Sequence, residues 1–143
     1  MKAKEYLSQI NVYRYQIEAL ARKRAELEHE AAGVKAITYD RDRVQTSPEN
    51  RLEKIMARLD DIDRRYSRRI EQYHKEVAKR EKQIAGLDTP LYAELLALRY
   101  IDGCSLQQAA DILHERHPDK QYNEDYIRRV HGWALMEFQK KYL

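Results

Sequence analysis

Apolar residues in the first two-thirds of the chain recur at spacings of three and four, the pattern of long helices that bury one narrow stripe. Arg24 interrupts the first run, and Asp63 and Arg80 occupy stripe positions in the second, so we expect charges to help set the register between two coiled-coil helices. The first run begins at Tyr6 and continues with Ile10, Tyr13, Ile17, Leu20, Leu27 and Ala31. The second comprises Leu52, Met56, Leu59, Tyr66, Ile70, Tyr73, Val77, Ile84 and Leu87.

Residues 32–47 lack this periodicity and predict an irregular link between the two helices. The second helix is expected to begin either with Thr46 and Glu49 as a capping box or with Ser47 as the cap before Pro48, and to run to about Gly86. A helical hairpin is the simplest use of such a link. Pairing of these helices with a second copy of the chain, as a homodimer, is the alternative that the sequence leaves open.

The last third shows shorter apolar stripes separated by turn residues. One helix is expected to end at Asp102-Gly103, a second to begin after Ser105 with Gln108 completing a capping box, and a third to follow Asn123. Pro90 suits the first turn of a preceding helix, so we place a domain boundary at residue 88. The stripes comprise Leu95, Leu98 and Ile101; Leu106, Ala109, Ala110, Ile112 and Leu113; and Ile127, Val130, Ala134, Leu135 and Phe138.

The predicted fold is all-α: a helical hairpin or coiled coil in residues 1–88, then a helix-turn-helix domain in residues 89–143. Runs rich in Val, Ile and Thr with strand-like alternation are missing. Charged residues make up 36% of the chain and its mean hydropathy is −0.89, and no apolar run is long enough to span a bilayer. With no signal-peptide pattern and Cys104 as the single cysteine, we expect a cytoplasmic protein that has no membrane partner.

Charge is distributed unevenly between the two parts. Residues 1–88 carry 20 Lys and Arg against 16 Asp and Glu, whereas residues 89–143 carry 7 against 8, which together give the overall charge of +3. Neutralisation of phosphates supplies most non-specific affinity for nucleic acid. A DNA-reading domain in residues 89–143 is therefore expected to bind only weakly by itself.

Two segments carry a resemblance to a known motif. LRYIDGCSLQQAADIL (residues 98–113) and YNEDYIRRVHGWAL (residues 122–135) resemble the two halves of the helix-turn-helix in region 4 of sigma factors. Preceded by a coiled coil and the linker YDRDRVQ (residues 39–45), the chain is similar to small prophage-encoded transcriptional regulators of Gram-positive bacteria, of the ArpU and RinA types. The resemblance implies regulation of phage genes, often late ones. One departure is the extended connection at residues 115–121, where Pro118 should end the second helix.

The helix expected over residues 123–142 is the one that would enter the DNA major groove. Arg128 or Arg129 suits bidentate contact with guanine, Glu124 suits cytosine N4, and Asn123 with the first-turn amides suits a phosphate. We expect Tyr100 and Trp133 to lie in the core. The residues predicted to contact DNA are Asn123, Glu124, Asp125, Tyr126, Arg128 and Arg129.

Other chemistry has little support in the sequence. His114 and His117 are too few for a metal site, and no catalytic or cofactor motif occurs, so we expect neither an enzyme nor a bound cofactor. The arginines of residues 64–69 are expected to be a solvated coiled-coil flank. Two alternatives to a DNA-binding regulator stay open: a DNA-packaging component like a small terminase subunit, and a protein-interaction adaptor that docks on RNA polymerase without reading DNA.

Overall fold

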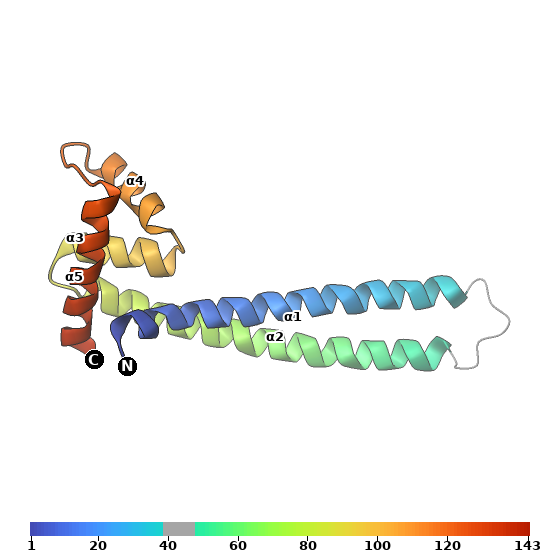
Figure 1. The fold of residues 1–143 in the computed structure, drawn as a ribbon. Helices are drawn as coiled ribbons and strands as arrows, with labels where there is room; N and C mark the ends of the chain where they lie inside the picture. The colour runs from blue at the N-terminus through green and yellow to red at the C-terminus, as the bar shows by residue number, and fades with distance from the viewer. Residues whose placement is uncertain (39–47) are drawn as a thin grey trace. The chain divides into compact units, whose positions relative to one another are not determined.

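The computed structural model describes residues 1–38 and 48–143, and every regular element in these ranges is helical. The elements are α1 (Ala3–Thr38), α2 (Pro48–Ala85), α3 (Pro90–Leu96), the π-helical turn η1 (Ala97–Ile101), α4 (Leu106–Arg116) and α5 (Glu124–Tyr142) (Figure 1). Helices α1 and α2 form a long hairpin within one chain, and the shorter helices α3–α5 pack together. The predicted all-α fold is confirmed.

The expected link at residues 32–47 is wrong in its first part, because α1 continues to Thr38. Ala31 and Val34 are 7% and 3% exposed and pack against α2, so burial of one more apolar turn extends the helix past Gly33. The predicted caps Thr46 and Ser47 lie outside the described residues. The second helix is confirmed, since it runs to Ala85 and ends at Gly86.

The chain divides into two compact units, and the division between them does not fall at residue 88. The hairpin unit comprises Tyr13–Tyr73, and the terminal unit comprises Met1–Val12 with His74–Leu143. The ends of both long helices thus belong with α3–α5. The reason is the packing of Ala3 and Leu7 with Leu96 and Phe138 in one apolar cluster.

In the hairpin unit the seam on α2 is shifted from the predicted one. Met56 is 54% exposed, and Ile55 and Ile62 are buried in its place with Leu59. They pack against Leu27, Ala31 and Val34 of α1. Arg24, which interrupts the first stripe, forms an ion pair with Asp63 of the second stripe. Its Nε donates to Asp63 Oδ1 over 2.6 Å.

The terminal unit contains a buried cation, Arg80, which is 1% exposed. Its guanidinium lies 4.1 Å from the centroid of the Tyr6 ring. It donates to the backbone oxygen of Tyr6 over 3.0 Å, to Gln9 Oε1 over 2.7 Å and to Glu76 Oε2 over 2.5 Å. These bonds join the start of α1 to the end of α2. Arg80, which occupies a position in the predicted apolar stripe of α2, is thus a buried charge whose guanidinium is bonded to residues of both long helices.

A second apolar cluster in the terminal unit holds α4 and α5 against α3 and η1. Ser105 caps α4 by accepting from the Gln108 amide, and Gln108 bonds back to the Ser105 amide, so the predicted capping box is confirmed. Gly103 precedes it with a φ of 75°, a conformation that glycine adopts readily. The buried members of the cluster are Leu95, Leu98, Ala109, Ala110, Leu113, Ile127 and Val130.

Helix α4 ends at Arg116, before Pro118, as predicted. In the described ranges, no helix has the length and apolar character needed to cross a membrane.

Candidate nucleic-acid interface

The first turn of α5 presents backbone amides and polar side chains at the surface of the terminal unit. Asn123 adopts an extended conformation, and its Oδ1 accepts from the Tyr126 amide over 2.8 Å, so the predicted cap is confirmed. Glu124 and Asp125 follow in the first turn, where carboxylates favour the positive end of the helix dipole. The Asn123 cap therefore sets Glu124 as the first residue of α5.

The two faces of α5 differ sharply. Ile127, Val130, Ala134 and Phe138 are completely buried, as the sequence predicted. Among the predicted DNA contacts, Asn123, Asp125, Arg128 and Arg129 are exposed, and Glu124 and Tyr126 are half-buried. Helix α4 packs behind α5 through the cluster that contains Ala110 and Leu113. The structure therefore gathers all six predicted residues on the first two turns of a helix supported from behind.

The two arginines are held differently. Arg128 Nη2 donates to Glu124 Oε1 over 2.8 Å in an ion pair whose side chains are 63% and 43% exposed. Such a solvated pair contributes a few tenths of a kcal/mol and exchanges easily for another anion. The guanidinium of Arg129 lies 5.9 Å from the centroid of the Tyr126 ring. Both cations are consequently oriented by neighbours on α5 and open to solvent.

An aromatic row beside these arginines was not foreseen. The rings of Tyr122 and Tyr126 stack with an interplanar angle of 3°, and Trp133 meets Tyr126 edge to face at 6.4 Å. The expectation that Trp133 lies in the core is wrong, because it is 46% exposed. It directly precedes Ala134 of the buried stripe, and one residue corresponds to a rotation of about 100° around the helix, which places Trp133 beside the stripe. Tyr100 is buried, as expected.

A small cleft of about 390 Å³ adjoins the start of α5, between Asp111 and His114 of α4 and the segment Gln121–Asn123. His114 Nδ1 lies 3.3 Å from the backbone oxygen of Lys120. His117 Nε2 lies 3.2 Å from Glu94 Oε2. These contacts fix the extended connection between α4 and α5. In residues 1–38 and 48–143, no His, Cys, Asp and Glu side chains form a group of three that could hold a metal ion.

His131 lies on the inner side of α5. Its Nε2 is 2.9 Å from the Tyr100 hydroxyl, and the two rings stack at 5.7 Å. Burial lowers the pKa of His131 from 6.5 to about 4, helped by the positive charges of Arg99 and Lys4. Burial also raises the pKa of Tyr100. The contact between α5 and η1 is thus made by a neutral imidazole at pH 7.

Acid should weaken this contact. The folded pKa of His131 lies below its unfolded value, so its stabilising contribution is complete above pH 6.5 and is lost as pH falls towards 4. We expect the difference in melting temperature between the wild type and His131→Gln, followed by circular dichroism, to shift in favour of the variant from pH 6.5 to pH 4. A constant difference across this range would show that His131 titrates normally in the folded protein.

No protein-family model, curated protein sequence or solved structure matches this chain.

Proposed function

We propose that the chain is a sequence-specific DNA-binding transcriptional regulator whose α4–α5 pair acts as a helix-turn-helix, with α5 in the major groove. One observation carries the proposal: exposed Arg128 and Arg129 share the first two turns of α5 with the Asn123 cap, and α4 packs on the opposite side. A recognition helix reads base edges with its N-terminal residues while its partner helix supports it. The resemblance to prophage regulators supports the same role at phage genes.

The residue types suit base reading. An arginine makes two hydrogen bonds to O6 and N7 of guanine, and a carboxylate accepts from N4 of cytosine. Arg128 and Glu124 are bonded to each other in the free protein, so each is positioned before DNA arrives. The first-turn amides of α5 not used by the Asn123 cap are available to a phosphate.

Affinity is expected to come from more than one contact. Residues 89–143 have a net charge of −1, which provides little attraction to phosphates. Pairing of two chains on one DNA, or docking on RNA polymerase, would raise the effective concentration of α5 at its site. We therefore expect measurable autonomous binding at low salt and stronger binding with a partner.

Selection from a random duplex-DNA library tests the proposal. The intact chain, at low salt, is expected to enrich a defined motif, and an inverted repeat within it would reveal two bound chains. Arg128→Ala/Arg129→Ala is expected to lose the enrichment. Failure of the intact chain to enrich any motif would overturn autonomous DNA recognition and favour an adaptor role.

Gly132 offers a second test that separates stability from binding. It lies in the middle of α5, four residues after Arg128 on the same face, and a Cβ added there meets nothing within 4 Å. Glycine inside a helix costs about 0.5–1 kcal/mol relative to alanine, and it lets a ligand approach the backbone closely. Gly132→Ala should therefore raise the melting temperature and yet weaken DNA binding about five-fold, roughly 1 kcal/mol.

Gly33→Ala is the matched control. Gly33 lies in α1, and a Cβ there also meets nothing within 4 Å. This variant should gain similar stability and bind DNA as the wild type does. Equal DNA affinities for both glycine variants, in fluorescence anisotropy with the selected duplex, would show that Gly132 is not at the interface.

A further inference from the structure

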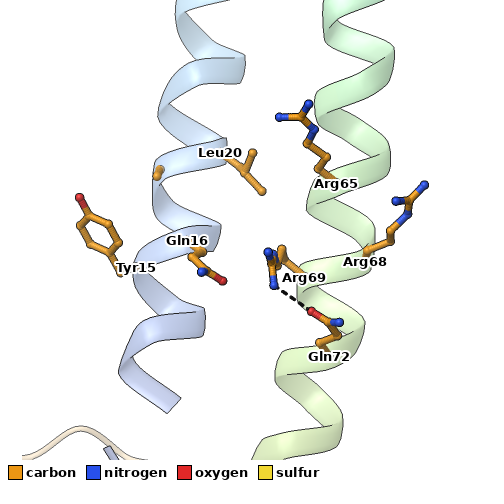
Figure 2. A pocket seen from close by; sticks show the side chains of 8 residues that line it. Tyr15, Gln16, Leu20, Arg65, Arg68, Arg69 and Gln72 are labelled. Carbon is orange, nitrogen blue, oxygen red and sulfur yellow. Dashed lines mark hydrogen bonds between the residues drawn. The ribbon is translucent and has the colours of Figure 1, made fainter. Parts of the chain in front are cut away.

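A groove runs along the hairpin unit between α1 and α2, with a volume of about 500 Å³. Figure 2 shows Gln16 and Leu20 of α1 and Arg65 and Arg69 of α2 pointing into the space between the two helices. Leu20 also packs against the buried apolar cluster of this unit. The groove thus adjoins the apolar seam of the hairpin. Ala19 and Leu20 of α1 give it an apolar floor, and its side on α2 is cationic.

Two of the three arginines that line this groove, Arg68 and Arg69, have no ion pair with a carboxylate of the described residues. Its lining within the described residues includes Arg65, Arg68 and Arg69 and contains no carboxylate. Arg65 pairs over 3.0 Å with Asp61, which lines the adjoining hollow between the two helices, and both side chains are more than half exposed. Arg69 donates to Gln72 over 3.1 Å, and neither it nor Arg68 forms an ion pair with a described carboxylate. From the sequence we expected these arginines to form only a solvated flank of the coiled coil. In the structure, three of them also line a groove.

We propose that this groove binds an acidic amphipathic helix of a protein partner. A helix laid in a groove between two helices places apolar residues on the floor, here Ala19 and Leu20. Arg65 and Arg69 are one helical turn apart, which matches carboxylates spaced i and i+4 on the incoming helix. Guanidinium groups hold carboxylates through paired hydrogen bonds.

Two other occupants fit less well. Duplex DNA is convex and too wide to reach the apolar floor, so it would use only the arginine tips and leave Leu20 uncovered. A second copy of this chain would need an acidic helix with a free apolar face. Among the described helices, α4 and α5 already bury their apolar stripes in the terminal unit, and the groove's own wall, α2, is rich in arginine.

Selection from a library of randomised peptides of about 20 residues, displayed against the intact chain, tests the inference. We expect enrichment of peptides with acidic residues one helical turn apart beside leucine-like residues. In fluorescence anisotropy, Arg65→Gln/Arg69→Gln should weaken the best peptide at least ten-fold. Ala19→Glu, which adds a carboxylate to the groove, should weaken it as well.

Lys54→Gln/Arg64→Gln is the matched control, because it removes the same charge from exposed positions of α2 outside the groove. It should leave the peptide affinity within about two-fold of the wild type. No enrichment, equal losses in the two double variants, or a loss of DNA binding in place of peptide binding in Arg65→Gln/Arg69→Gln would each overturn the inference. Circular dichroism checks that every variant is folded.

Discussion

Arg80→Ala is expected to lower the free energy of unfolding by about 3 kcal/mol, the range found when a buried, hydrogen-bonded charge is removed. The change removes the bonds from Arg80 to Tyr6, Gln9 and Glu76 and the contact with the Tyr6 ring. It also opens a cavity the length of the side chain between α1 and α2. Urea unfolding followed by circular dichroism measures the loss as a lower midpoint at unchanged slope.

Arg68→Ala is the control for charge and helix propensity. Arg68 is an exposed arginine of the same helix, and its replacement should change the unfolding free energy by less than about 0.5 kcal/mol. Arg80→Met keeps much of the apolar stem and leaves Glu76 one-third exposed to water, so it should lose less than Arg80→Ala. Loss of under about 1 kcal/mol in Arg80→Ala would show that the network adds little net stability.

Most of the helix ends could be predicted from the sequence because local chemistry sets them. Ser105 with Gln108, and Asn123, satisfy amides within three residues of themselves. Gly103 supplies a conformation that other residues avoid. These interactions need no distant partner, so a short stretch of sequence contains the information.

Seam positions were harder to predict because two stripes fit the same spacing. Ile55, Leu59 and Ile62 compete with Met56, Leu59 and Asp63 on α2, and only the position of α1 decides between them. The Arg80 network also depends on Tyr6, 74 residues away in the chain. Because its partners are distant in the chain, the only local sign of this network in the sequence is a charged residue at a position of the apolar stripe.

The candidate interface likewise contains some features that could be predicted from the sequence and others that could not. Helical spacing from Asn123 was enough to put Arg128 and Arg129 on the exposed side of α5, opposite Ile127. The ring stack of Tyr122 on Tyr126 depends on the path of the extended connection before α5, which spacing does not specify. The exposure of Trp133 follows from helical spacing, since it lies about 100° around α5 from the buried Ala134. Its edge contact with Tyr126 does not follow from spacing.

Arg128→Ala/Arg129→Ala is expected to weaken binding to the selected duplex by at least about 30-fold. Each bidentate arginine–guanine contact contributes about 1–3 kcal/mol of discrimination, so the loss of two amounts to at least about 2 kcal/mol. Both side chains are exposed, so the fold should be unaffected. Fluorescence anisotropy at several salt concentrations measures the affinity, and the affinity for an unrelated duplex should fall much less.

Lys54→Ala/Arg64→Ala removes the same charge from the hairpin unit and separates base reading from general attraction. If α5 reads bases, this control should bind the selected duplex within about two-fold of the wild type, because neither side chain is among the predicted base contacts and the attraction of exposed charges to DNA is screened by salt. Equal losses for the two double variants on both duplexes would mean that the arginines of α5 contribute charge alone. The selected motif would then have to be read by another part of the chain, since phosphate contacts by themselves carry no sequence information.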